Sequence, residues 1–248
     1  AYIKHHIITD YYSYIRLFPA ELMAVYTAFI KGGSPTLIPL PWQYSDFAQK
    51  QAQLLTRDAI SNKQQYWRDF FSGFAWPEQR ADSFSEHASK GIAPSYNTSW
   101  QHIPAGIINN CIKIAERQNC TLFIVVLTTI ALLVRFLYNH SQVLLCMASA
   151  NRKLPGAEHV IGCFFTNIIM SLKILSGQRL AELMQDVKST FITARQQQDM
   201  PFEMFAEDLG LECTRQCRPP YRIYISYRPS ADDVPFSLPD SHLTPIEV

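Results

Sequence analysis

Two adjacent histidines near the start of the chain, His5 and His6, are followed four residues later by the carboxylate of Asp10. Imidazole is the usual general base because its unperturbed pKa lies close to neutral. Residues 2–8 are rich in β-branched side chains and predict a strand, which sends neighbouring side chains to opposite faces. One histidine is then anchored in the protein while the other points into a cleft. Asp10 is interpreted as a structural partner that holds the turn. A half-buried strand end with two hydrogen-bonded imidazoles is the alternative.

The elements that must position these residues follow from hydrophobic periodicity. Apolar residues at helical spacing predict a helix over 13–30, ended by Gly32-Gly33-Ser34-Pro35. The further predicted elements are helices at 44–71, 105–118, 121–138 and 180–196, and strands at 96–103, 143–150, 163–174 and 221–228. Strands interleaved with helices indicate an α/β fold.

A segment rich in Gly, Pro, Ser and Asp at 72–96 has the composition of a linker. The predicted division places 1–90, with the histidine pair, in one lobe and 91–248 in the other. A chain of 248 residues is long enough for one large domain or two lobes, each with its own core.

Composition excludes several classes of protein. Hydrophobic residues make up 48% and charged residues 17%, which excludes a disordered chain. A net charge of +1 without a basic cluster argues against binding nucleic acid. The longest apolar run, 122–134, is shorter than the roughly 20 residues that span a bilayer, so we expect a buried helix and no membrane partner.

The six cysteines are scattered and form no CxxC pair, which indicates reduced thiols, a cytoplasmic location and no metal site. Cys146 and Cys163 lie in apolar runs and are interpreted as small buried hydrophobic residues.

Short motifs lie in order along the chain, and each is weak alone. They are HHIITDYYS at 5–13, YSDFA at 44–48, QYW at 65–67, NR at 151–152, IGCFFTN at 161–167, QDMPFE at 198–203 and RPPYRI at 218–223. In type and order they resemble HHxxxDG and the later motifs of the condensation domains of nonribosomal peptide synthetases. These domains belong to the chloramphenicol-acetyltransferase-like acyltransferase superfamily.

The resemblance implies a two-lobed α/β fold with a sheet flanked by helices in each lobe and a tunnel between the lobes. It implies transfer of an acyl group from a thioester to an amine, forming a peptide bond. The implied partners are two carrier domains, which present the substrates on 4'-phosphopantetheine arms, and an adenylation domain of the same synthetase. No cofactor of the chain's own is implied.

The resemblance also assigns roles to the candidate catalytic residues. His6 faces the tunnel and is the reacting residue, His5 gives structural support, and Asp10 fixes the loop. An α-amine titrates at about 7.7–8.0 and an imidazole at about 6.5, so proton exchange between them is nearly balanced. Whether His6 abstracts the proton or orients the amine stays open. Asp10 is expected to pair with an arginine upstream of the motif, in a part of the domain that this chain lacks.

Several positions depart from the family pattern. Tyr11 replaces the glycine of HHxxxDG, whose backbone N–H is a candidate oxyanion donor. Tyr11 either narrows the substrate route or adopts an ordinary φ with its phenol toward solvent or the lobe interface. Ser13-Tyr14 partly matches the ending of epimerization-domain motifs, Thr166-Asn167 inverts the family's Asn-Thr, and Gln197 stands in place of a histidine. By its motifs the chain resembles the middle of the domain, somewhat over half of it, with an incomplete N-terminal lobe.

Three functions remain open on the sequence. The first is an active condensation domain that forms peptide bonds. The second is a related acyltransferase that forms an ester with the same histidine. The third is a degenerate domain that no longer catalyses and serves as a docking platform for a partner enzyme.

Overall fold

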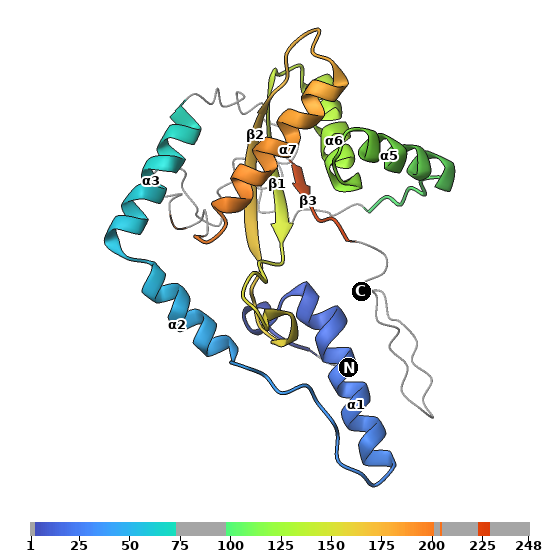
Figure 1. Cartoon of the computed structure of the whole chain (residues 1–248), viewed down its shortest axis with the longest axis vertical. Coiled ribbons are helices and arrows are strands. Elements are labelled where there is room, and N and C mark those ends of the chain that lie inside the picture. Colours follow the sequence, from blue (N-terminus) through green and yellow to red (C-terminus); the bar gives the residue numbers. More distant parts are fainter. Residues whose placement is uncertain (1–2, 73–97, 201–203, 205–222, 229–248) are drawn as a thin grey trace, which may run out of the picture. The chain divides into compact units, whose positions relative to one another are not determined.

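The computed structural model describes residues 3–72, 98–200, 204 and 223–228 (Figure 1). The chain forms two compact units. Unit 1 comprises Ala1–Ile60, Ala148–Asn167 and Ser226–Val248, and unit 2 comprises Ser61–Met147 and Ile168–Ile225. Nearly all of the predicted linker at 72–96 lies outside the described residues, so the division into 1–90 and 91–248 stays a prediction.

Unit 2 is built around a three-stranded sheet in the order β2-β1-β3. Strand β1 spans Gln142–Ser149, β2 spans Thr166–Lys173, and β3 spans Ile223–Ile225 and pairs in parallel with β1. Five consecutive residues of β1 are buried, as in a strand covered on both faces. The helices are α5 (Ala105–Arg117), α6 (Leu122–Tyr138), α7 (Leu180–Gln196) and, from Ser61 on, α3 (Arg57–Ser72). Helices α6 and α7 share one apolar core with β1 and β2, so the strands are held rigidly.

Unit 1 carries the histidine pair. A 3-10 turn, η1 (His6–Ile8), precedes a helix that begins at Tyr11, contains the π-helical turn η2 (Ser13–Leu17) and continues as α1 (Phe18–Ile30). Single π-helical turns are frequent at functional sites. Helix α2 (Tyr44–Leu54) and the short turn η3 (Ala157–His159) complete the unit. Its core gathers the aromatic rings of Trp42, Tyr44 and Phe47 around the buried Phe164.

Most predicted elements are confirmed. The helices at 13–30, 105–118, 121–138 and 180–196 agree with the structure within two residues. Of the predicted strands, 143–150 is β1, the one at 163–174 begins three residues later as β2, and the one at 221–228 is represented by β3.

Three predicted elements are wrong. Residues 6–8 form a 3-10 turn instead of a strand, because the imidazole Nδ1 of His5 accepts the backbone N–H of Ile7 at 3.1 Å and closes the chain locally. The predicted helix at 44–71 is broken at Leu55 and Thr56, where the Thr56 hydroxyl accepts the N–H of Ala59 at 3.3 Å and so caps a new helix. Residues 98–104 form no strand.

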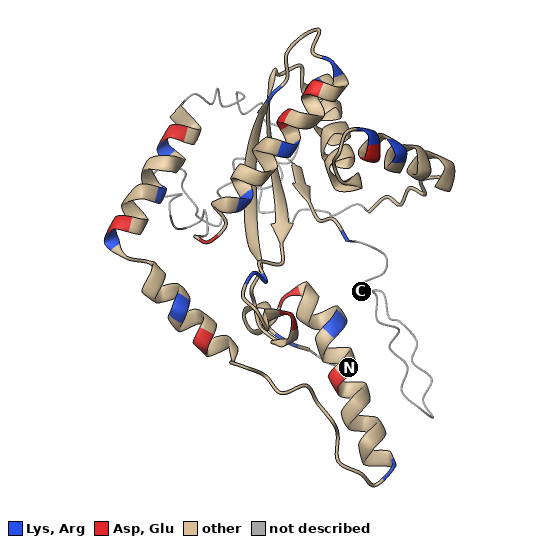
Figure 2. Ribbon diagram, viewed as in Figure 1, with Lys and Arg blue, Asp and Glu red and all other residues tan. Residues whose placement is uncertain are grey.

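Charge and hydropathy patterns agree with a folded α/β protein. Figure 2 shows basic and acidic residues interspersed on α3, α5 and α7. No helix in the described ranges is by itself long and apolar enough to cross a membrane. Helices α5 and α6 pass that test of length and composition only as a pair, bent by 104°.

The contact between Gly162 and Tyr44 joins two of the sequence motifs inside unit 1. A Cβ atom built at Gly162 would lie 2.2 Å from Cδ2 of the Tyr44 ring. The Tyr44 hydroxyl donates to the carbonyl of Cys163 at 2.8 Å, which holds the ring in place. Only glycine therefore allows α2 to approach the chain at residue 162.

We expect Gly162→Ala to destabilise unit 1 by about 1–3 kcal/mol, the usual cost of overpacking a well-filled contact. Gly33→Ala in the same unit is the matched control, because the nearest heavy atom to its Cβ is 3.9 Å away and its φ is not positive. Urea unfolding followed by tyrosine and tryptophan fluorescence measures both. Equal midpoints for the two variants would show that Tyr44 moves aside freely.

Candidate active site

The buried ion pair between Asp10 and Arg152 is the centre of the candidate site. Nη2 of Arg152 lies 2.9 Å from Oδ1 and 3.1 Å from Oδ2 of the carboxylate. The two side chains are only 6% and 3% exposed. A buried ion pair is tolerated when its remaining hydrogen-bonding groups are also satisfied. Both partners have such additional bonds.

Asp10 uses its carboxylate to fix two further backbone segments. Oδ1 accepts the N–H of Ser13 at 2.8 Å, which caps the helix that starts at Tyr11. Oδ2 accepts the N–H of Phe164 at 3.1 Å, and the backbone N–H of Asp10 donates to the carbonyl of Gly162 at 3.1 Å. One side chain thus joins the helix start to the segment before β2.

Arg152 spreads the same connection to η3. Nη1 donates to the carbonyls of Ala157 and, at 2.7 Å, Val160, while Nη2 also donates to the Ser13 hydroxyl at 2.7 Å. The guanidinium carbon lies 4.3 Å from the ring centroid of Phe164 and 4.5 Å from that of Tyr12. Such planar stacking and forked donation suit arginine and not lysine.

The expectation that Asp10 pairs with an arginine upstream of the motif is wrong. Its partner is Arg152, which lies downstream, three residues after the last residue of β1. Asn151 adopts a left-handed conformation with φ of 49°, which asparagine tolerates better than most residues, and this turn directs the chain into Arg152. The Asn151-Arg152 motif marks the arginine in the sequence, but its position along the chain does not show which carboxylate forms the ion pair with it.

The structure places His5 and His6 on the exposed turn η1, immediately before the buried Thr9 and Asp10. The His5 imidazole caps that turn through its bond to Ile7. Nδ1 of His6 lies 3.8 Å from Sγ of Cys163, and its ring contacts Phe165 edge-on with centroids 6.3 Å apart. The imidazole of His6 is therefore oriented on its Nδ1 side while the residue as a whole stays exposed.

Cys163 is not the small buried hydrophobic residue that the sequence predicts, because its half-buried thiol contacts His6. The residues before and after Cys163 are fixed by hydrogen bonds to the start of the first helix. Gly162 exchanges two hydrogen bonds with Ser13, at 3.0 and 3.1 Å, and the N–H of Phe164 donates to Asp10. Burial, together with the negative charge of Asp10, raises the pKa of the Cys163 thiol. The group beside His6 is therefore a neutral thiol near neutral pH.

Tyr11 adopts an ordinary helical conformation and is not among the residues with positive φ. The absence of glycine therefore strains nothing at this position. The Tyr11 ring lies under the guanidinium of Arg228, whose central carbon is 3.9 Å from the ring centroid. Sequence reasoning missed Arg228, since no motif marks it.

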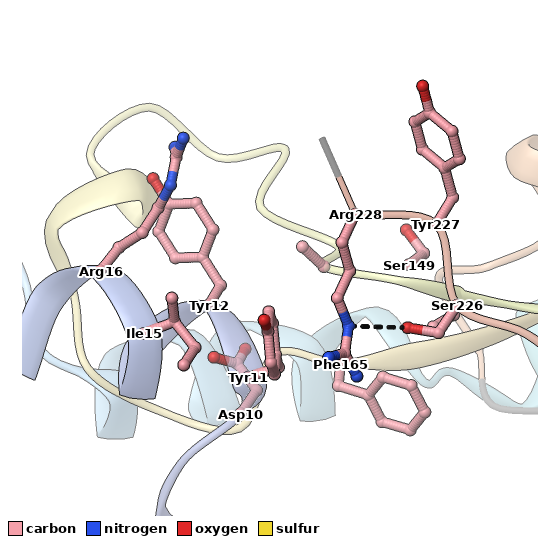
Figure 3. Close-up of a pocket in the computed structure, with 12 residues that line it drawn as sticks. Asp10, Tyr11, Tyr12, Ile15, Arg16, Ser149, Phe165, Ser226, Tyr227 and Arg228 are labelled. Carbon is pink, nitrogen blue, oxygen red and sulfur yellow. Dashed lines mark hydrogen bonds between the residues drawn. The ribbon is translucent and has the colours of Figure 1, made fainter. Parts of the chain in front are cut away.

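A cavity of about 140 Å³ lies beside Tyr11 within unit 1 (Figure 3). Its lining combines residues at the start of the first helix, at the end of β1 and just after it, immediately before β2, and after β3. They are Asp10, Tyr11, Tyr12, Ile15, Arg16, Ala148, Ser149, Ala150, Phe165, Ser226, Tyr227 and Arg228. Phe165 borders the cavity and also contacts His6, so the cavity lies one ring away from the imidazole.

The later motif residues belong to unit 2 or lie outside the described ranges. Gln197 accepts a hydrogen bond from Nζ of Lys63 at 2.5 Å, and Gln198 is buried, both within unit 2. Residues 201–203 and 218–222 lie outside the described ranges. In the part of the chain that is described, no three His, Cys, Asp or Glu side chains are grouped to hold a metal ion.

Comparison with known proteins identifies the family of the chain. The family described as Condensation domain matches residues 3–230, so the chain belongs to the condensation domain family. The resemblance to condensation domains of nonribosomal peptide synthetases, which are amide-forming acyltransferases, is thereby confirmed.

Two curated relatives are long synthetases. Malpinin synthetase of Mortierella alpina is 26% identical over 246 residues, which is 99% of this chain and 3% of the relative. One of the polypeptides of linear gramicidin synthase from Brevibacillus parabrevis is 28% identical over 227 residues, 88% of this chain and 4% of the relative. The chain thus spans only a small part of the relatives it matches.

Solved structures confirm the α/β, chloramphenicol-acetyltransferase-like fold. The first condensation domain of the CDA synthetase matches with a TM-score of 0.73 and 16% identity, over 95% of this chain and 50% of that domain. The X-domain from teicoplanin biosynthesis matches with a TM-score of 0.68 and 20% identity, over 89% of this chain and 49% of that one. The chain spans about half the length of these solved domains.

We expect Asp10→Asn to lower the free energy of unfolding by about 3–5 kcal/mol, because it leaves Arg152 buried without its counter-charge. Glu182→Gln is the matched control. It removes the charge from an ion pair of 3.6 Å with Arg179 whose side chains are 57% and 84% exposed, so about 0.5 kcal/mol or less is expected. Urea unfolding of both variants gives the comparison. An Asp10→Asn protein as stable as the parent would contradict the role of the ion pair.

The raised pKa of Cys163 predicts slow alkylation. Iodoacetamide reacts with the thiolate, so the rate at Cys163 should reach half its maximum at a higher pH than that of the same cysteine in the urea-unfolded chain. Peptide mass spectrometry across a pH series measures the rate at this cysteine alone. A profile displaced to lower pH would show instead that a protonated His6 stabilises the thiolate.

Proposed function

We propose that the chain is the central part of a condensation domain that forms an amide bond between a carrier-bound acyl or aminoacyl donor and a carrier-bound aminoacyl acceptor. The observation that carries the proposal is the buried Asp10–Arg152 pair, which fixes the segments that hold His6 against Cys163 and Phe165. An oriented and exposed imidazole on a rigid support is what proton transfer to or from a substrate requires.

In the proposed reaction, the α-amine of the acceptor attacks the carbonyl carbon of the donor thioester. The C–N bond forms, the amine loses a proton, and the C–S bond breaks to release the donor's thiol. His6 either accepts that proton or holds the amine and steadies the charged intermediate. His5 supports it by capping η1, and Asp10 fixes the loop.

The proposed substrates arrive on the 4'-phosphopantetheine arms of donor and acceptor carrier domains, with an adenylation domain in the same synthetase. The length of the curated relatives supports further domains, since this chain matches 3–4% of each. The reaction balances without a cofactor of the chain's own. A cytoplasmic location stays a prediction from the scattered cysteines, of which Cys111, Cys120 and Cys163 are free thiols in the structure.

The docking-platform alternative is raised by one solved relative, a complex of an X-domain with OxyB from teicoplanin biosynthesis. Two observations favour the catalytic proposal for this chain. His5, His6 and Asp10 are all present, and Tyr11 takes the place of glycine without a strained backbone. The ester-forming alternative uses the same histidine with a hydroxyl acceptor.

The test is His6→Ala in a protein extended to the full length of the solved condensation domains. Loss of a positioned acid or base costs about 10²–10⁴-fold, so amide formation between two loaded carrier domains should fall by at least about a hundredfold. His140→Ala, at an exposed histidine of unit 2, is the control. His5→Ala should chiefly reduce soluble yield. Mass spectrometry of the carrier-bound product gives the rate.

Condensation at the parent rate in His6→Ala would falsify the catalytic role. An acceptor carrying a hydroxyl in place of the amine separates the ester-forming alternative. If that acceptor reacts faster than the amine, the chain is an ester-forming acyltransferase. If neither reacts in the parent protein while a partner enzyme binds, the docking platform is correct.

A further inference from the structure

The cavity beside Tyr11 has the size of one amino-acid side chain. Its volume is about 140 Å³. An engineered apolar cavity of about 150 Å³ binds benzene, so a single six-membered ring or a branched aliphatic group fills a space of this size. Tyr11, Ile15, Ala148 and Phe165 contribute rings, methyl groups and an aliphatic chain to its wall.

The charges at the cavity do not select an ionic ligand. The Asp10 carboxylate is neutralised by Arg152 within hydrogen-bonding distance. Two further arginines line the cavity, and each lies over a tyrosine ring. The guanidinium carbon of Arg16 is 5.3 Å from the Tyr12 ring centroid. The Arg228 guanidinium covers the Tyr11 ring, and its Nε donates to the Ser226 hydroxyl at 3.3 Å (Figure 3). A guanidinium over an aromatic ring is already attracted to the negative face of that ring. The apolar wall is therefore the part of the cavity that selects the ligand.

Tyr11 sets the limit of the cavity. Its side chain occupies the position where the family motif has a glycine, which has no side chain at all. The contact with Arg228 over one face of the ring favours this position of the phenol at the wall, although the Tyr11 residue is 41% exposed. The Tyr11–Arg228 pair therefore closes a space that the family's glycine leaves open.

The cavity lies close enough to His6 to bind part of a substrate of the proposed reaction. Phe165 lines it and contacts the His6 imidazole, and Asp10 lines it and follows His6 by four residues. A side chain seated in the cavity is one ring away from the imidazole, which suits an acceptor whose amine reaches His6.

We propose that this cavity is the side-chain subsite for the acceptor amino acid, and that the Tyr11–Arg228 pair restricts it to apolar side chains no larger than one six-membered ring. This inference rests on the proposed function for the identity of the substrate. Tyr11 and Arg228 are specificity-determining residues, and neither takes part in bond formation.

The direct test measures binding to the whole chain, without catalysis. The probes are N-(2-acetamidoethyl) amides of glycine, leucine, phenylalanine, tryptophan and glutamate, stable analogues of the carrier-bound thioester. Methyl resonances of ¹³C-labelled Ala148 and Ala150 report occupation of the cavity. Burial of an apolar side chain is worth about ten- to a hundredfold in affinity, so the leucine and phenylalanine analogues should bind that much more tightly than the glycine analogue.

Tyr11→Ala should enlarge the cavity, so the tryptophan analogue should gain about tenfold or more in affinity, while Tyr11→Phe, the matched control, keeps the parent order. Arg228→Gln should shift the order in the same direction as Tyr11→Ala by a smaller factor, since it releases the ring without removing it. If Tyr11→Ala fails to fold, Arg228→Gln alone decides the test.

Three results would overturn the inference. They are methyl shifts that do not respond to the probes, equal affinity for the glycine and phenylalanine analogues, and tighter binding of the glutamate analogue. The same measurements on His6→Ala separate this inference from the proposed function. Under both proposals, His6→Ala keeps size-selective binding while losing condensation. Size-selective binding in a parent protein of full domain length that does not condense its substrates would refute the proposed function alone, whereas condensation by the parent without selective binding at Ala148 and Ala150 would refute only the subsite.

Discussion

The arrangement of unit 1 depends on one buried ion pair, Asp10–Arg152, whose partners are 142 residues apart in the chain. Removing two charges from water is expensive, and the cost is offset when most of the remaining donors and acceptors are used; in this pair the buried Nε of Arg152 has no hydrogen-bond partner among the described residues. Here the carboxylate also accepts two backbone N–H groups, and the guanidinium also donates to two carbonyls and a hydroxyl. The pair therefore specifies the positions of four segments at once, which an apolar contact does not do.

The residues packed around the ion pair connect it to His6 and orient the imidazole. Gly162 admits the Tyr44 ring, Tyr44 holds the carbonyl of Cys163, and the thiol of Cys163 contacts His6. Each contact needs a specific residue type. Position 162 must lack a Cβ atom, position 44 needs a phenol that reaches the carbonyl, and position 163 needs a small, weakly polar side chain. The exposed imidazole is thus oriented from a rigid base, although the turn that carries it is itself at the surface.

The replacement of the motif glycine by Tyr11 is compatible with the packing that supports His6. Position 11 lies in the first turn of a helix, where any L-residue is comfortable, so the change costs no backbone strain. What it changes is the space available beside the site. In the proposed subsite, such a substitution changes which side chains fit, and the contacts that support His6 do not pass through the Tyr11 side chain.

Local patterns in the sequence were enough to predict the helices at 105–118, 121–138 and 180–196, the strand at 143–150 and the family, since periodicity and short motifs are properties of neighbouring residues. They also marked His5, His6 and Asp10 as site residues, whose roles stay a proposal. Only the tertiary structure decided that Arg152 is the partner of Asp10, that Cys163 contacts His6 and that Arg228 covers Tyr11. Those contacts join residues more than 140 positions apart, and their energy comes from burial and charge pairing that exist only after the chain has folded.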